Sequence, residues 1–122
     1  MIRAVIPAIP IIRIFSEDQA KAFYLDFLGF KLEWEHRFEA EFPLYAQVKR
    51  SDLTLHLSEH HGDATPGSAV FVPMNNVDAF QQELIAKNYK YAKPAIQDLP
   101  WGRMIEVANP FGNKIRFCEL SD

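Results

Sequence analysis

The chain of 122 residues lacks several features that define large protein classes. Its single cysteine, Cys118, excludes an internal disulfide, which suits a reducing compartment. The most apolar stretch, residues 4–12, contains two prolines and is far shorter than the ~20 apolar residues of a membrane-spanning helix. No small-x-small cleavage pattern follows this stretch, so we expect no signal peptide and predict a cytoplasmic protein without membrane contact.

Charge of one sign is also scarce. Thirteen Lys and Arg oppose sixteen Asp and Glu, which leaves a net charge of −3, and no basic run is interleaved with aromatic residues. The chain therefore lacks the electrostatic footprint of a nucleic-acid-binding protein. Phosphate-binding loops, dinucleotide-binding glycine patterns and Gly-x-Ser-x-Gly sequences are absent too, which removes the common kinase, dehydrogenase and hydrolase interpretations.

The residues that are present, 48% apolar and 24% charged, are typical of one globular domain, which we expect to span residues 1–122. Turn-forming residues concentrate at positions 60–67. On each side of this segment the pattern predicts a strand, a helix and three further strands. We therefore expect two tandem βαβββ repeats, at residues 1–61 and 67–120.

The first repeat opens with the β-branched and apolar stretch 5–14, which predicts a buried strand, and its prolines place that strand at a sheet edge. Ser16 is the expected cap of a helix that ends at Gly29. Strands are then predicted at 44–49, at 53–58, and over 31–38, where Leu32, Trp34, His36 and Phe38 alternate with charged residues.

The second repeat begins with a predicted strand at 68–74 and a helix that runs from its cap, Asn76, to near Asn88. The last three strands are predicted at 91–96, where Pro94 weakens the pattern, at 101–108 and at 114–119.

These patterns predict an α+β fold in which the two repeats form a curved mixed sheet, with the helices on its outer face and a concave cleft on its inner face. Alternation turns Leu55 and Leu57 toward the helix and leaves His56 for the cleft. In the last hairpin, five residues fall on the cleft side: Met104, Glu106, Lys114, Arg116 and Cys118. Such a mixture of polar and apolar side chains is typical of a small-molecule site.

Residues 56–60 spell the His-x-x-Glu-His pattern of inverted zinc proteases. That chemistry needs both histidines on one helical face, whereas the flanking leucines predict a strand. We therefore interpret His60 and His61 as part of a solvated loop.

Residues 23–30 read Phe-Tyr-x-x-Phe-Leu-Gly-Phe, and Trp-Gly-Arg at 101–103 precedes Asn-Pro-x-Gly-Asn at 109–113. The first motif resembles the first-helix signature, and the second the closing hairpin, of the glyoxalase, bleomycin-resistance and dioxygenase superfamily, also called the vicinal oxygen chelate fold. The resemblance covers nearly the whole chain and implies paired βαβββ modules.

Enzymes of this superfamily hold a divalent metal with ligands on the first and last strand of each repeat. The resemblance places those positions at Ile9, His56, Ala69 and Arg116. Only His56 could bind a metal, whereas catalytic sites generally need three or more N, O or S ligands. The resemblance therefore implies no metal, no cofactor and no catalytic residue in this chain.

The chain is most similar to the bleomycin-resistance branch, whose Pro-Trp-Gly sequence before the closing hairpin matches residues 100–102. Members of that branch bind the drug without chemistry, in two clefts between subunits that exchange their N-terminal strands. The resemblance implies a homodimer that holds a planar, partly cationic antibiotic or similar ligand between aromatic rings. The expected ligand-binding residues are Trp34, Phe38, His56, Phe71, Trp101, Met104, Glu106 and Arg116.

Other interpretations of these residues stay open. Trp34 could simply cover the edge of the core, and Glu106 and Arg116 could form a structural pair across the hairpin. The protein could also be a metal-dependent enzyme of the superfamily, a lyase or dioxygenase with displaced ligands such as His36, His56 and Glu106. A third alternative is a dimer that holds a metabolite or a peptide in its cleft.

Overall fold

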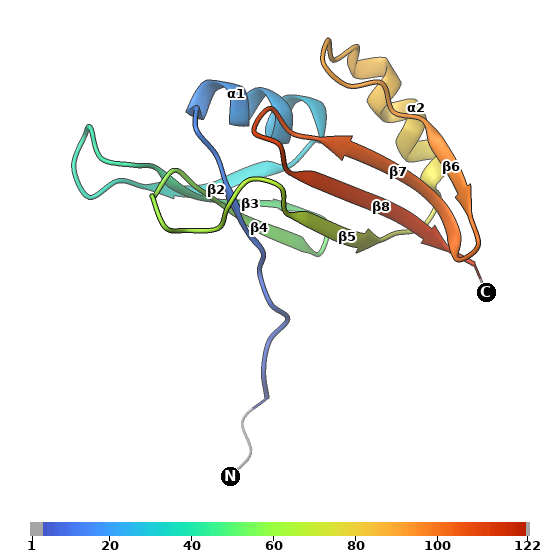
Figure 1. Cartoon of the computed structure of the whole chain (residues 1–122), viewed down its shortest axis with the longest axis horizontal. Coiled ribbons are helices and arrows are strands. Elements are labelled where there is room, and N and C mark those ends of the chain that lie inside the picture. The colour runs from blue at the N-terminus through green and yellow to red at the C-terminus, as the bar shows by residue number, and fades with distance from the viewer. Residues whose placement is uncertain (1–3, 122) are drawn as a thin grey trace.

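Eight strands form two four-stranded mixed sheets, in the orders β1-β4-β3-β2 and β5-β8-β7-β6 (Figure 1). The computed structural model describes residues 4–121, so residues 1–3 and 122, which the expected domain includes, lie outside it. The elements are β1 Ile11–Arg13, α1 Glu17–Lys21, η1 Ala22–Phe27, β2 Lys31–His36, β3 Tyr45–Arg50, β4 Leu53–Ser58, β5 Ala69–Pro73, α2 Val77–Lys87, β6 Ile96–Leu99, β7 Gly102–Ala108 and β8 Lys114–Leu120.

The α+β fold class with two βαβββ modules is confirmed. In each module the first strand runs parallel to the last, and the other neighbouring strands are antiparallel. The strands are hydrogen-bonded as two sheets rather than as one continuous sheet. Both helices lie on the same side of the sheets, and the opposite side is uncovered (Figure 1). Within residues 4–121, no helix is long and apolar enough to cross a membrane.

The first helix begins and ends where the sequence predicts. The Ser16 hydroxyl accepts a hydrogen bond from the backbone N–H of Gln19, and α1 continues as the π-helical segment η1. Gly29 then turns the chain at a φ of +76°, a conformation that other residues adopt at a cost. A Cβ at this position would also lie 2.7 Å from Nη1 of Arg50, so the turn needs glycine for space as well.

One apolar core connects the two modules. It contains the buried stripe of the first helix together with Leu55, Ile105, Ile115 and Phe117, which point inward from β4, β7 and β8. The predicted inward parity of these strands is confirmed. Because the same core is built from both halves of the chain, the modules stabilise each other.

The two motifs that resemble the superfamily meet in space. In the loop between β7 and β8, Oδ1 of Asn109 accepts hydrogen bonds from the backbone N–H groups of Phe111 and Asn113, each at 2.9 Å. The amide nitrogen of Asn109 donates to the Tyr24 hydroxyl at 2.9 Å, and that of Asn113 donates to the carbonyl of Arg13 at 3.0 Å. The closing loop of one module is thus attached to the first helix and first strand of the other.

The N-terminal segment differs from the prediction. Only Ile11–Arg13 pairs with β4, whereas Val5 is 93% exposed and the chain before β1 extends away from the sheets (Figure 1). Pro7 and Pro10 have no N–H with which to continue a ladder, which explains why the strand is short. The carbonyl of Pro10 still accepts a hydrogen bond from the N–H of His56. The predicted edge position of the strand is confirmed.

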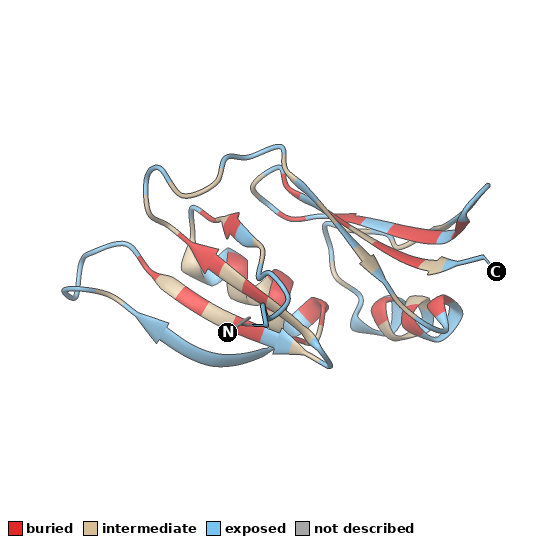
Figure 2. Ribbon diagram, turned by 90° about the horizontal axis from the view of Figure 1, so that it is seen from below, coloured by how far each residue is buried: buried red, intermediate tan, exposed pale blue. Residues whose placement is uncertain are grey.

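Two further strands depart from the sequence pattern. The strand predicted at 91–96 is wrong: β6 starts only at Ile96, after Pro94, and pairs with β7 up to Leu99. In β2 a bulge at Glu33 interrupts the alternation, so that Leu32 lies opposite Val48 and Trp34 opposite Gln47. Leu32 and Trp34 therefore point to different faces. The β2 edge is exposed along its whole length (Figure 2).

Candidate functional site

The uncovered face of the first sheet carries a row of aromatic and polar side chains. The β-sheet register sets Trp34 beside Gln47 and Gln47 beside His56. The ring of Trp34 stacks on Tyr45, with centroids 6.1 Å apart and an interplanar angle of 15°. It also meets the ring of His56 edge-on at 5.5 Å. Trp34 is 43% exposed, so part of its ring is free to contact a ligand.

A chain of hydrogen bonds fixes the orientation of His56. Gln47 donates from Nε2 to the Glu33 carboxylate at 2.9 Å, so its Oε1 faces Nε2 of His56 at 2.8 Å and accepts from it. The other ring nitrogen, Nδ1, lies 2.7 Å from the Tyr45 hydroxyl. A neutral imidazole with its proton on Nε2 satisfies every group in this chain, because Tyr45 can then donate to Nδ1.

Beside this row lies a cavity of about 400 Å³, which we call the aromatic cup. Six residues line the aromatic cup: Trp34, His36, Phe38, Tyr45, His60 and Asp63. The ring of Phe38 meets His36 edge-on at 4.9 Å and His60 at 6.4 Å. Burial raises the pKa of the Tyr45 hydroxyl, and the nearby charge of Asp63 raises it further.

The aromatic cup contains predicted residues and others that the sequence interpretation missed. Trp34 and Phe38 were expected at the site, and His56 contacts them through Trp34 and Tyr45. Tyr45 could have been found, because it shares strand parity with the predicted face. His60 and Asp63 could not, because they belong to an irregular loop whose path no periodicity describes.

The uncovered face of the second sheet carries an ion pair. Arg116 of β8 donates from Nε to the Glu106 carboxylate of β7 at 2.9 Å, and these two residues are direct cross-strand neighbours. Lys114 lies 3.9 Å from the other carboxylate oxygen. Phe71, on β5, stands on the other side of Arg116 and is 45% exposed. The structural pair that the sequence left open is therefore formed, and an exposed aromatic ring lies next to it.

The remaining predicted residues lie elsewhere on the second module. Trp101, in the connection between β6 and β7, is 52% exposed, whereas Met104 is only 7% exposed and pairs with Cys118. Among residues 4–121, no hydrogen bond, ion pair or ring contact joins the expected residues of the first sheet to those of the second.

The strand registers refine the positions that hold metal in the superfamily's enzymes. Ile11, rather than Ile9, lies opposite His56, and Phe71, rather than Ala69, lies opposite Arg116. Neither Ile11 nor Phe71 has a side-chain atom that could bind a metal. His56 and Arg116 already have polar partners. In the part of the chain from 4 to 121, no three His, Cys, Asp or Glu side chains come together as a metal site, so His36, His56 and Glu106 do not form one. The residues present do not fit a divalent metal.

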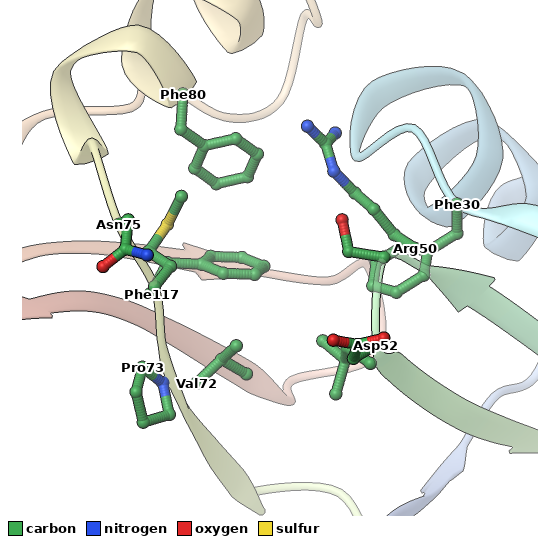
Figure 3. Close-up of a pocket in the computed structure, with 11 residues that line it drawn as sticks. Phe30, Arg50, Asp52, Val72, Pro73, Asn75, Phe80 and Phe117 are labelled. Carbon is green, nitrogen blue, oxygen red and sulfur yellow. The ribbon is translucent and has the colours of Figure 1, made fainter.

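A second cavity, of about 520 Å³, opens at the seam between the modules (Figure 3). The rings of Phe80 and Phe117 face Arg50 across it (Figure 3). Arg50 forms a two-pronged ion pair with Glu83 and donates to the carbonyl of Leu28 at 2.7 Å. None of the predicted site residues lines this seam cavity, and its charged group is already paired.

Paired βαβββ modules, each with one face of its sheet uncovered, define the vicinal oxygen chelate class of fold. A family model described as glyoxalase superfamily protein matches residues 4–122, so the chain belongs to the glyoxalase superfamily. No curated protein matches the sequence significantly.

Solved structures of bacterial proteins share the fold. A bleomycin-binding protein from bleomycin-producing Streptomyces verticillus, solved with copper(II)-bleomycin, is 26% identical; the match has a TM-score of 0.70 and covers 98% of this chain and 100% of that one. An antibiotic-binding protein from Streptomyces sp. CB03234 is 24% identical, with a TM-score of 0.69 and the same coverage. A superfamily member from Sphaerobacter thermophilus is 18% identical, with a TM-score of 0.70, and covers 94% of this chain and 98% of that one.

Proposed function

We propose that this protein binds and sequesters a planar, partly cationic small molecule, such as a bleomycin-like antibiotic, without converting it. The observation that carries the proposal is the exposure of large aromatic rings on both uncovered sheet faces: Trp34 and Phe38 on the first, Phe71 on the second. Offset stacking of a planar ligand on such rings contributes about 0.5–1.5 kcal/mol per pair beyond area burial. The likeness to the bleomycin-binding protein of Streptomyces verticillus supports the same ligand class.

We further propose that the complete cleft lies between two copies of the chain. Stacking a ligand on both sides needs two facing walls, and the two uncovered faces of one chain have no contact with each other. In a homodimer, the first sheet of one copy would face the second sheet of its partner. The apolar residues Val5, Ile6 and Ile9 are exposed and extend from β1, as a segment exchanged between subunits would. A cytoplasmic location agrees with the free, buried thiol of Cys118.

Each expected residue has a role in this proposal. Trp34 and Phe38 stack on the ligand from one wall and Phe71 from the other, while Trp101 contacts it from the connection between β6 and β7. Glu106 and Arg116 present a paired carboxylate and guanidinium at the second wall, where either could bind a polar group of the ligand. The remaining two belong to these walls: the ring of His56 meets Trp34 edge-on, and Met104 lies buried on the same side of β7 as Glu106.

Sequestration, unlike catalysis, needs affinity but no stabilisation of a transition state. The hydrogen bonds that occupy both ring nitrogens of His56 support this distinction, because they leave no free base there. The guanidinium of Arg116 is likewise occupied, by its ion pair with Glu106, and this also supports binding without catalysis.

Isothermal titration of metal-free bleomycin into the protein and its Trp101→Ala variant tests the proposal. We expect saturable binding to the unchanged protein, weakened about tenfold in the variant because a stacked ring and its buried area are lost. Tyr91→Ala is the matched control, since Tyr91 is a similarly exposed aromatic residue outside both faces. Equal affinity of all three proteins would remove Trp101 from the site, and no binding by any would contradict the proposed function.

A further inference from the structure

We propose that the aromatic cup of the first module binds an alkylated ammonium group, such as a trimethylammonium or dimethylammonium arm. This inference rests on the proposed function for its setting and adds to it the chemistry and the place of the ligand's cationic part. The alternative, a neutral guest in the aromatic cup, is one of the outcomes of the test below.

The wall of the aromatic cup is almost continuous aromatic surface. Tyr45 meets His60 at 6.2 Å and Trp34 at 6.1 Å, and Phe38 meets both His36 and His60. Most of these contacts are edge-to-face, at interplanar angles between 61° and 88°, so neighbouring rings turn different faces toward the space between them. The negative faces of Trp, Tyr and Phe rings attract a cation that lies within about 6 Å of the ring centroid.

Asp63 is the only acidic residue among the six that line the aromatic cup. Its carboxylate is held in place by the hydroxyl of Ser58, which is buried and donates to it at 2.8 Å. The hydroxyl of Ser58 in turn accepts from the N–H of His60 at 3.0 Å, so the loop presents the carboxylate in a fixed orientation. A fixed negative charge beside ring faces favours a cation over a neutral guest.

Two positive side chains near the aromatic cup, Arg37 and Lys21, are paired with carboxylates other than Asp63. Arg13, the register partner of Ser58, and Lys31 and Lys49 of β2 and β3 form no ion pair within residues 4–121, and none of these side chains pairs with Asp63. Arg37 forms ion pairs with Glu17 and Glu59, and Lys21 forms them with Glu17 and Glu35. On the sheet floor, Glu33 adds a further carboxylate through its hydrogen bond to Gln47. In the described part of the chain, residues 4–121, neither Asp63 nor Glu33 forms an ion pair, so no neighbouring side chain neutralises these two carboxylates.

The kind of cation follows from what the lining offers. A primary ammonium needs three hydrogen-bond acceptors to replace its water, whereas an alkylated ammonium presents mostly C–H surface and loses less solvation free energy on leaving water. A lining of aromatic rings with a single carboxylate therefore favours an alkylated ammonium. The volume of about 400 Å³ is enough for the alkylated group together with the chain that joins it to a larger ligand.

Choline and its neutral isostere 3,3-dimethyl-1-butanol provide the test, because they have the same shape and differ in charge. The Trp101→Phe variant leaves Trp34 as the sole tryptophan, so its fluorescence reports on the aromatic cup. We expect saturable quenching by choline and an affinity for 3,3-dimethyl-1-butanol that is lower by about tenfold. Asp63→Asn, which keeps an acceptor for Ser58, should lower the affinity for choline by about fivefold. Glu41→Gln, an exposed change in the loop after β2, should leave the affinity for choline unchanged.

Equal affinity for choline and 3,3-dimethyl-1-butanol, or a flat response to both, overturns the inference, as does an Asp63→Asn variant that binds choline unchanged. Titration of the same samples with metal-free bleomycin separates this inference from the proposed function. Choline selectivity without drug binding supports the cation site and contradicts the drug-binding function. Drug binding without choline selectivity supports the drug-binding function and contradicts the cation site.

Discussion

Each ring nitrogen of His56 has a hydrogen-bond partner, and this determines what the residue can do. As a metal ligand it would have to give up either Tyr45 or Gln47, at the cost of a half-buried polar group left unpaired. As a neutral imidazole between these partners it instead keeps the rings of Trp34 and Tyr45 in position. In the proposed site, a residue at a metal-binding position of the superfamily thus becomes part of the ligand-binding wall.

Tyr24 allows a prediction at the residue scale. Its ring is buried, burial raises the pKa of its hydroxyl, and its only side-chain partner in the described residues is Asn109. Tyr24→Phe would leave the amide nitrogen of Asn109 without an acceptor inside the core. We expect the free energy of unfolding in urea to fall by about 1–2 kcal/mol. Tyr91→Phe, at an exposed position, should change it by less than about 0.5 kcal/mol, and an equal loss in both variants would contradict this account.

Arg50 and Glu83 connect elements of the two modules, β3 and α2. The hydrogen bond from Arg50 lowers the pKa of the Glu83 carboxyl, and burial opposes this to a smaller degree. Because the lowered pKa belongs to the folded state, the pair stabilises the fold above the unfolded-state pKa of about 4.5. This stabilisation is lost as the pH falls through the folded-state pKa. Both side chains are about one-third exposed, so solvent screening keeps the contribution small.

The prediction for Glu83→Gln follows from this linkage. At pH 7 the variant should unfold with about 0.5–1 kcal/mol less free energy than the unchanged protein, and the difference should shrink toward zero as the pH is lowered below 4.5. Chemical denaturation across this pH range measures the difference. Glu41→Gln, in an exposed loop, is the control and should show little difference at any pH. A difference for Glu83→Gln that stays constant with pH would contradict the ion-pair explanation.

Local patterns predicted most elements, because caps and side-chain alternation depend on neighbouring residues alone. Ser16 and Asn76 cap the helices as expected, and the leucines of β4 point inward. The bulge at Glu33 depends on how β2 pairs with β3, so the sequence of β2 alone does not reveal it. The burial of Met104 has the same kind of cause, since it depends on contacts made by its strand in the folded module.

At the scale of the whole molecule, the arrangement of the two modules decides how the site works. They share a core and are joined by the hydrogen bond from Asn109 to Tyr24. Sequence patterns predicted two modules and one cleft, but they contain no information about which faces meet. The proposed dimer resolves this, because it gives each face an opposite wall in the partner.

The most direct test of this account is a tryptophan fluorescence titration of the metal-free protein with metal-free bleomycin. Trp34 lies on β2 and Trp101 in the connection between β6 and β7, and both should contact the ligand when two copies form the cleft. We expect saturable quenching at one drug molecule per chain. The tryptophan fluorescence of both single-tryptophan variants, Trp34→Phe and Trp101→Phe, should still be quenched by the drug. A flat titration, or quenching that never saturates, would contradict the central claim that this protein sequesters such a ligand.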